Sequence, residues 1–398
     1  MNKLILSLCI AEIFSISSIM YFPALLPDFQ AEWGITNTEI GWINGIFYGG
    51  YAALVPILVS LTDRVDPRRI YLLSAALGAV SMIGFGWLAQ GTWSAATFQL
   101  LAGISFAGTY MPGLKVLSDR ITGPGRSRGI SFYTASIGIG TALSVFLTGF
   151  LANWVGWRWA AELIAIGPLI GFVLFAFSVK SGKQRSPDKK AMIAFWDLRP
   201  ALRNRSAVGY MLGYAAHCWE LFGFRSWLVA FLFFSLSLQP EKSCQFTIQN
   251  IATAIILAGV PASIFGNEGA MRWGRRHVII AVMLSSGLLG SVIGFSAGLP
   301  FMIVVCFCFV YWISVMFDSG SLTAGMVSAA RSDEIGRTMA MYSFLGFCMA
   351  FLAPIAVGSV LDIIGNGIVG WGFAFATLGL IEMSGPVWLR LFRSGEEN

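Results

Sequence analysis

Five ionisable side chains inside long apolar stretches of the sequence could form a substrate-binding or proton-coupling site. His217 and Glu220 are three positions apart, so a helix would place them on one face, and Arg225 follows about a turn and a half later. Glu12 and Asp318 lie in two other apolar stretches. A charge near the middle of a bilayer costs about 3 kcal/mol on insertion scales, so buried ionisable residues are functional candidates by default.

The chemistry open to these residues is proton transfer coupled to solute movement. Burial in a low-dielectric cavity favours the protonated form of a carboxyl group. Glu12, Glu220 and Asp318 could therefore take up and release protons, with His217 as a partner or relay. The alternative for Glu220 is a permanent internal salt bridge with Arg225 or His217 that fixes helix packing.

Aromatic side chains in the same kind of stretch could line a cavity beside the ionisable groups. Each of them could instead face lipid or pack against a neighbouring helix, as most aromatic residues of membrane helices do. The residues predicted to line the cavity are Tyr48, Tyr110, Tyr133, Trp219, Tyr311 and Tyr342.

Nothing in the sequence resembles a soluble catalytic site. There is no Walker loop for ATP hydrolysis and no dinucleotide fingerprint, and the chain has only two histidines, His217 and His277. We therefore expect a protein that is not an enzyme, with no catalytic residue, no cofactor and no metal site.

The elements that must position these side chains are membrane-spanning helices. Hydrophobic residues make up 56% of the chain and charged residues 12%, whereas soluble proteins carry roughly 25% charged residues. Apolar stretches of about 20 residues recur, and a helix of that length spans the hydrocarbon core. We predict twelve of them, near 4–26, 40–62, 70–90, 94–116, 129–151, 158–178, 207–234, 248–267, 278–297, 301–328, 338–361 and 371–391.

The basic residues fall on one side of this twelve-helix map. Of the 26 lysines and arginines, Arg158 and Lys242 lie on the opposite side and Arg225 lies inside a helix. The positive-inside rule then places both termini in the cytoplasm of a multi-pass inner-membrane protein. The net charge of +6 thus reflects topology, and we expect no nucleic-acid partner.

The two halves of the chain repeat one another at a nearly constant spacing. Glu12 and Glu220 are 208 positions apart, and Tyr133 and Tyr342 are 209 apart. Arg68 and Arg69 match Arg275 and Arg276, Arg128 matches Arg337, Gly149 matches Gly358, and Gly156 and Trp157 match Gly370 and Trp371. We predict a six-helix bundle over 1–179, a cytoplasmic linker over 180–206 and a second bundle over 207–398. Such repeats are typical of secondary transporters.

Two loops carry a recognisable pattern. LTDRVDPRRIYLL at 61–73 and GNEGAMRWGRRHVI at 266–279 resemble the gating loop of the major facilitator superfamily, and GWRWA at 156–160 and GWGFAF at 370–375 resemble its helix 6 and helix 12 openings. The first loop departs from the pattern at Val59, Asp66 and Pro67, and the second at Met271. The resemblance implies an all-α membrane fold of 12 transmembrane helices in two pseudo-symmetric six-helix bundles.

The resemblance also implies roles for individual residues. Helices 1, 4, 7 and 10 line the central cavity in that family, which would place Glu12, Glu220 and Asp318 at it. Glu162 and Glu382 would fall in peripheral helices, where we expect a structural or interfacial role. The cytoplasmic gate would consist of Asp63, Arg64, Arg68 and Arg69 in one half and Glu268, Arg272, Arg275 and Arg276 in the other, although these basic residues could also serve only to set topology.

The function that we predict is secondary active transport of a small solute by alternating access, with protons as the coupling ion. The alternatives are a non-transporting membrane sensor with a transporter fold and an uncoupled facilitator. Three buried acids favour a cation or zwitterion as solute, whereas Arg225 could hold a carboxylate or another small anion. The sequence leaves the solute and the direction of transport open, and we expect a monomer in the lipid bilayer.

Overall fold

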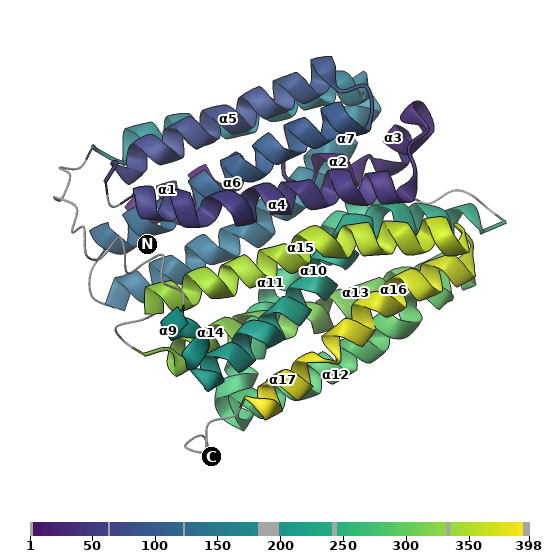
Figure 1. Ribbon diagram of the computed structural model, residues 1–398. Helices are drawn as coiled ribbons and strands as arrows, with labels where there is room; N and C mark the ends of the chain where they lie inside the picture. The colour runs from purple at the N-terminus through teal and green to yellow at the C-terminus, as the bar shows by residue number, and fades with distance from the viewer. Residues whose placement is uncertain are drawn as a thin grey trace. The chain divides into compact units, whose positions relative to one another are not determined.

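The computed structural model describes residues 3–62, 64–121, 124–181, 199–240, 245–331 and 335–392, and within these ranges the regular structure is helical throughout (Figure 1). The predicted gate residue Asp63 and most of the predicted linker, 182–198, lie outside the described residues.

The first predicted span is not one continuous helix. Helix α1 covers Lys3–Ser15, and after a run of turns α2 covers Tyr21–Ala24 and α3 covers Leu26–Trp33. A serine-rich segment accounts for the break, because short hydroxyl side chains compete for backbone partners. Ser17, for example, donates through Oγ to the carbonyl oxygen of Phe14 at 2.8 Å. Gly34, at φ 61°, then ends α3 in the left-handed conformation.

Helices α4 to α7 follow with short connections. Their bounds are α4 Asn37–Leu61, α5 Pro67–Leu88, α6 Thr92–Arg120 and α7 Pro124–Ser178. The described apolar part of α7 runs over 51 residues, about 76 Å at 1.5 Å per residue, which is more than twice the roughly 30 Å hydrocarbon core. The chain turns at Gly156, whose φ of 77° and ψ of 162° are not helical. Helix α7 therefore comprises two spans.

The turn at Gly156 yields a stability prediction. A residue other than glycine in this backbone region costs about 1 to 3 kcal/mol, and a Cβ at Gly156 would meet no atom within 4 Å, so Gly156→Ala should lower stability through backbone strain alone. Thermal unfolding of the purified protein measures the effect. Gly336→Ala is the matched control, because Gly336 is helical with equally open surroundings. Equal unfolding temperatures for the two variants would contradict this reading of Gly156.

The second half of the chain contains two helices interrupted within a span. Its elements are α9 Arg199–Arg203, α10 Arg205–Ser237, α11 Ile248–Trp273, α12 Arg275–Ile293, η1 Gly294–Gly298, α13 Phe301–Phe317, α14 Ser319–Ala329, α15 Ile335–Ile364, α16 Ile368–Glu382 and α17 Gly385–Leu391. Asp318 is the break between α13 and α14, and Glu382 is the last residue of α16, just before the break to α17. Both breaks place an acid at the end of a helix.

Ten helices among the described residues are long and apolar enough to cross a membrane. Counting the segments before and after Gly156 as two spans, and adding the broken first stretch, gives the twelve spans that the sequence predicts. The all-α membrane fold class is confirmed.

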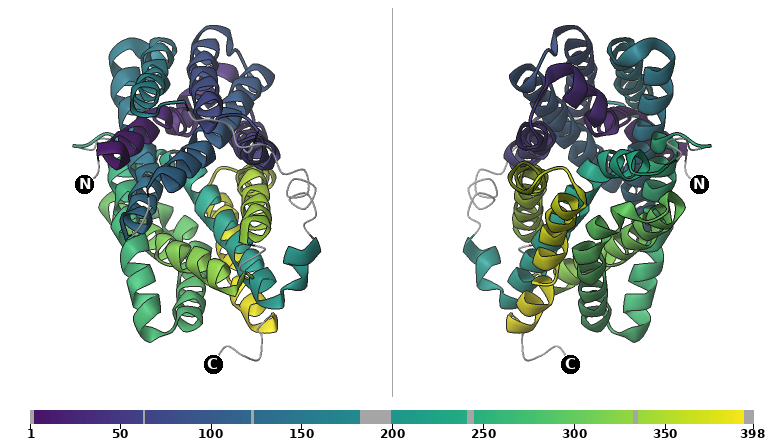
Figure 2. Two further views of the ribbon diagram at one scale, coloured as in Figure 1. Left: turned by 90° about the vertical axis from the view of Figure 1, so that its left-hand side faces the viewer. Right: turned by 90° about the vertical axis from the view of Figure 1, so that its right-hand side faces the viewer.

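The helices form two compact units. The first comprises Met1–Ile35, Ile46–Asp188 and Ala252–Leu257, and the second comprises Thr36–Gly45, Lys189–Ile251 and Ala258–Asn398. In the first unit α1 packs against α7, and α5 packs against α6 and α7. In the second, α10 packs against α15 and α12 against α16, and Figure 2 shows these helices from two further sides. The division at 180–206 stays a prediction.

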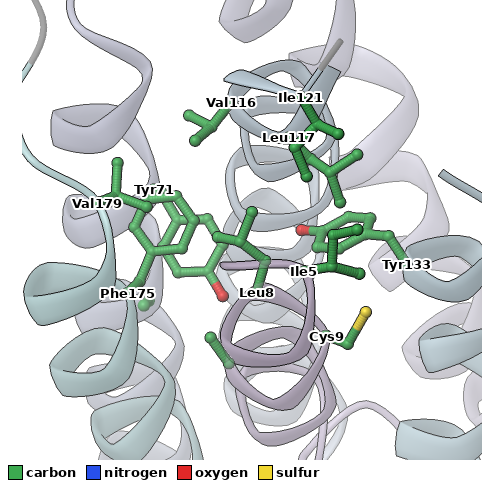
Figure 3. Close-up of a cluster of buried hydrophobic side chains, with 12 residues drawn as sticks. Ile5, Leu8, Cys9, Tyr71, Val116, Leu117, Ile121, Tyr133, Phe175 and Val179 are labelled. Atoms are coloured by element: carbon green, nitrogen blue, oxygen red, sulfur yellow. The ribbon is translucent and has the colours of Figure 1, made fainter. Parts of the chain in front are cut away.

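Each unit has its own apolar core. In the first unit a cluster of buried side chains joins α1, α5, α6 and α7 and includes Leu8, Tyr71, Leu117, Tyr133 and Phe175 (Figure 3). In the second unit a corresponding cluster joins α9, α10, α12, α14, α15 and α17. The two tyrosines of the first cluster lead to the first candidate site.

Candidate functional site

The carboxyl group of Glu12 is the centre of a buried polar site in the first unit. Its side chain is 0% exposed. The hydroxyl of Tyr133 donates to Glu12 Oε2 at 2.8 Å, and the hydroxyl of Tyr71 reaches the same oxygen at 3.5 Å. Figure 3 shows the two hydroxyls directed toward one another from opposite sides of α1. Ser15 Oγ lies 2.9 Å from the Tyr71 hydroxyl and completes the chain of hydrogen bonds.

Packing fixes the two tyrosine rings. The Tyr71 ring stacks on Phe175 with centroids 3.6 Å apart and an interplanar angle of 7°. The Tyr133 ring lies nearly parallel to Tyr110, at 5.8 Å and 9°. Three helices, α1, α5 and α7, therefore hold one carboxyl group and its two hydroxyl partners in place.

Glycine in α6 makes room for the Tyr133 hydroxyl. A Cβ on Gly113 would overlap that hydroxyl oxygen, and it would lie 3.0 Å from Tyr133 Cζ and 3.2 Å from Tyr71 Cε2. Gly171 in α7 serves Ser15 in the same way, because a Cβ there would overlap Ser15 Oγ and lie 2.7 Å from the carbonyl oxygen of Ala11. These clearances were not predicted from the sequence, because the Pro112–Gly113 pair does not show which side chain of another helix approaches it.

Glu12 has no basic partner in the part of the chain that the structure describes. Ion pairs in that part include Lys115 with Asp119, Arg158 with Glu32, and His217 with Asp318, and Glu12 takes part in none of them. Glu12 Oε1 also accepts no hydrogen bond from a described residue. An isolated buried charge is costly, and a group in such surroundings neutralises instead. The arrangement suits a carboxyl group that alternates between a neutral and an ionised form.

A second cluster of ionisable groups lies in the second unit. The hydroxyl of Tyr311 in α13 donates to Glu220 Oε1 at 3.0 Å, and His217 Nδ1 lies 2.9 Å from Asp318 Oδ1. All these side chains are buried. The clearance seen at Tyr133 recurs at Gly290 in α12, where a Cβ would lie 2.6 Å from the Tyr311 hydroxyl and 3.2 Å from Glu220 Oε1.

Glu382 joins this second cluster. A nitrogen of His217 and carboxylate oxygens of Asp318 and Glu382 all lie within 4.8 Å of one another. The resemblance placed Glu382 in a peripheral helix, yet its side chain is 0% exposed and points into the second unit. The position of Glu382 beside a helix break is visible only once the end of α16 is known.

The remaining ionisable residue of the predicted site, Arg225, lies on α10 and is buried. Its guanidinium carbon sits 4.6 Å from the centre of the Phe222 ring, a cation–π geometry. The ion pairs among the described residues do not include Glu220. Glu220 is therefore held by Tyr311 rather than by the permanent salt bridge considered from the sequence.

The predicted cavity aromatics divide into two groups. Tyr133 and Tyr311 donate to the buried carboxylates, and Tyr110 packs on Tyr133. The other three take part in packing contacts. The Tyr48 ring is edge-on to Phe47, and Trp219 Nε1 donates to the carbonyl oxygen of Thr377. The Tyr342 ring stacks on Tyr214, and its hydroxyl forms a hydrogen bond with Thr323.

Several predicted gate residues contact the ends of neighbouring helices. Arg68 donates to the carbonyl oxygen of Ala176 at 3.0 Å, and Arg275 and Arg276 donate to Ser328 and Ser206 at 3.2 Å. Asp66 caps α5 by accepting from the backbone nitrogen of Arg68 and also accepts from Ser181. An Asp-Pro pair favours the start of a helix, because Asp caps the first turn and Pro fits its first position. Asp66 was not among the predicted gate residues. The other described gate residues lie near the same connections. Arg64 is between α4 and α5, Arg69 is in the first turn of α5, and Glu268 and Arg272 are in the last two turns of α11.

Comparison with known proteins identifies the family of this chain. Residues 8–242 match the family model described as Major Facilitator Superfamily. The chain is 26% identical over 155 residues to the probable sphingolipid transporter spinster homolog 1 of Arabidopsis thaliana, covering 39% of this chain and 31% of that one. It is 23% identical over 299 residues to the protein spinster of Drosophila melanogaster, covering 71% and 48%. The aligned regions thus span less than half the length of these two relatives.

A solved structure resembles the whole chain. A bacterial homolog to the human lysosomal transporter spinster, crystallised in an inward-facing and occupied conformation, superposes with a TM-score of 0.73 over 98% of this chain and 94% of that one, at 14% identity. That likeness concerns the fold. The relatives whose descriptions state an activity are transporters, in keeping with the expectation that the chain is not an enzyme. The family match extends over more than half of the sequence, and the chain belongs to the major facilitator superfamily.

Proposed function

We propose that this chain is a secondary transporter that moves a small amphiphilic solute across the cytoplasmic membrane by alternating access, with a proton carried by Glu12. The observation that carries the proposal is the fully buried Glu12 carboxyl group, bonded to tyrosine hydroxyls and without an ion-pair partner among the described residues. Both termini would lie in the cytoplasm, as the distribution of basic residues predicts.

Hydroxyl partners suit a proton carrier better than a basic partner does. A tyrosine hydroxyl can donate to an ionised carboxylate and can accept from a protonated carboxyl group. An arginine or lysine has no acceptor and would hold the carboxylate in its ionised form. The contacts of Glu12 with Tyr133 and Tyr71 therefore support both states of the group, which a transport cycle requires.

The proposed solute class rests on the relatives. The Arabidopsis relative is described as a probable sphingolipid transporter, and we extend that class to this chain as a single-chain sphingolipid or similar amphiphile. The Glu220 and Tyr311 pair would provide a second carboxyl group that can change its protonation state, and Arg225 would attract an anionic headgroup. We propose a monomer as the transporting unit.

Proteoliposome uptake tests the solute class. Vesicles containing the purified chain should take up a fluorescent single-chain sphingolipid with a charged headgroup, which crosses a bare bilayer slowly, faster than empty vesicles do. Uptake of a sugar and of an amino acid should not exceed that of empty vesicles. If none of the amphiphiles tested moves and one of them nevertheless stabilises the protein thermally, the sensor alternative replaces transport.

Tyr133→Phe tests the hydrogen bond to Glu12. A hydrogen bond to a charged group contributes about 1.5 to 3 kcal/mol, and each 1.4 kcal/mol is about tenfold, so we expect proton-driven uptake to fall by roughly tenfold or more. Tyr110→Phe is the matched control, since the hydroxyls that reach Glu12 belong to Tyr133 and Tyr71, and it should retain uptake. Equal rates in the two variants would remove Tyr133 from the coupling site.

A further inference from the structure

The second unit holds a cluster of side chains of the types that ligate metals, and proton coupling at Glu12 does not use it. His217, Asp318 and Glu382 each offer one ligand atom, and the three atoms lie within 4.8 Å of one another. The three side chains are 0–1% exposed. Both ring nitrogens of His217 and both carboxylate oxygens of Asp318 and of Glu382 form no hydrogen bond with a described residue, so buried donor atoms are available to a ligand.

The spacing of these atoms is close to that of a metal site. Ligand atoms about 2.1 Å from a metal ion lie roughly 3 to 3.4 Å apart when adjacent and about 4.2 Å apart when opposite. His217 Nδ1 and Asp318 Oδ1 are 2.9 Å apart, which matches adjacent ligands. A small rotation of the Glu382 side chain, whose oxygens are not bonded to described residues, would bring the third ligand into range.

Two of the three ligands sit where a membrane helix is interrupted. Asp318 separates α13 from α14, and Glu382 ends α16 before α17 begins at Gly385. Backbone that is not helical at membrane depth is tolerated only where it is buried in protein or lines a cavity. Interrupted helices are also where transporters place the ligands of ions. His217 reaches the same point from the unbroken α10.

The surroundings of the cluster are rich in acidic side chains. Glu220 lies close enough to Asp318 and Glu382 for the three carboxylates to repel one another. Among the described residues of the second unit, Arg225 is the arginine or lysine whose side chain is buried. Acidic side chains therefore outnumber basic ones here, and a bound cation would offset the repulsion between the carboxyl groups.

We infer that His217, Asp318 and Glu382 form a binding site for a divalent first-row transition-metal cation. The mixed donor set selects this class, because imidazole nitrogen suits Zn²⁺, Cu²⁺, Fe²⁺ or Ni²⁺, whereas Ca²⁺, Mg²⁺ and Mn²⁺ prefer oxygen ligands. Three protein ligands leave a fourth position open for water or for a group of the solute. The site is separate from Glu12 and goes beyond the proposed proton coupling, and it departs from the sequence-based expectation of no metal.

Cobalt titration of the full chain, purified without a histidine tag and treated with a chelator, tests this inference. We expect one Co²⁺ per chain, with a visible ligand-field spectrum of nitrogen and oxygen ligands. His217→Gln and Glu382→Gln should weaken binding at least about tenfold. His277→Gln is the matched control, because it removes the other histidine of the chain, which is exposed, and it should bind Co²⁺ like the unmodified protein. Glu12→Gln should do the same, which separates this test from proton coupling.

A second measurement needs no variant. X-ray absorption by Co²⁺ bound to the unmodified chain should report one imidazole and carboxylate oxygens. Absence of stoichiometric Co²⁺ binding would mean that the cluster holds protons only and would overturn the inference. Sulfur ligands, or loss of binding in His277→Gln with retention in His217→Gln, would overturn it as well.

Discussion

Replacing Glu12 with glutamine is expected to reduce proton-driven accumulation of solute to the level of empty vesicles while solute exchange continues. Glutamine mimics the protonated carboxyl group and can still bond to Tyr133 and Tyr71, which contact Glu12 at 2.8 and 3.5 Å. It cannot release a proton, however. The variant therefore always resembles the protonated carrier, and it can cross between its two conformations only with solute bound. Counterflow with solute on both sides of the membrane measures exchange, and uptake driven by a pH gradient measures coupling.

Glu162→Gln is the matched control for this experiment. Glu162 is a partly buried carboxyl group of α7 in the same unit, and its replacement should leave both counterflow and gradient-driven uptake unchanged. Gradient-driven accumulation that survives in Glu12→Gln would show that another group carries the proton. Loss of counterflow together with accumulation would instead indicate that Glu12 binds the solute.

The second large effect is expected from a residue without any charge. Gly113→Ala would place a methyl group against the Tyr133 hydroxyl and 3.0 Å from its Cζ atom, so the hydroxyl that donates to Glu12 must shift to make room. Tyr133 is fully buried and stacked on Tyr110, so the whole site must rearrange. We expect gradient-driven uptake to fall at least as far as in Tyr133→Phe, roughly tenfold or more on the hydrogen-bond estimate.

Gly336→Ala provides the comparison for Gly113→Ala. Gly336 is in α15, and an added Cβ there would meet nothing within 4 Å. Alanine favours a helix over glycine by up to about 1 kcal/mol, so this variant should keep full uptake and normal or slightly raised stability. If Gly113→Ala transported as well as Gly336→Ala, the position of the Tyr133 hydroxyl would not matter to coupling.

The spans and the internal repeat were predictable because apolar stretches and a constant spacing between matching residues are visible in a single sequence. Stretches of apolar residues mark the spans, and the alternation of basic loops checks their number. The interruption at Ile16 to Met20 was not predicted, because the first stretch is apolar at both ends and serines also occur within continuous membrane helices. A boundary between two spans was predicted between residues 151 and 158, and the turn at Gly156 lies there.

The candidate sites were predictable only in part. The repeat relates Glu12 to Glu220, and both are fully buried. It also relates Tyr133 to Tyr342, but Tyr342 bonds to Thr323, and Tyr311 takes its place at Glu220. Which helix face meets a given carboxyl group depends on the rotation and tilt of each helix, which packing sets. A constant offset along the chain contains no such information.

The residues that complete the sites were missed for related reasons. Gly113 and Gly290 matter because of the tyrosine hydroxyls that approach them from another helix. Glu382 matters because α16 ends there, beside a histidine from α10 and an aspartate at the end of α13. Each of these features arises where three helices meet, and no local signal in the sequence marks such a meeting point.

The central claim is that solute movement carries protons, and one measurement tests it most directly. Proteoliposomes loaded with a pH-sensitive dye, with equal pH on both sides, receive an outward or inward gradient of a single-chain sphingolipid that the chain transports. We predict a luminal pH change that requires the protein, follows the direction of the solute gradient and disappears in Glu12→Gln. Solute movement at full rate with no change in luminal pH would contradict the account and would identify an uncoupled facilitator.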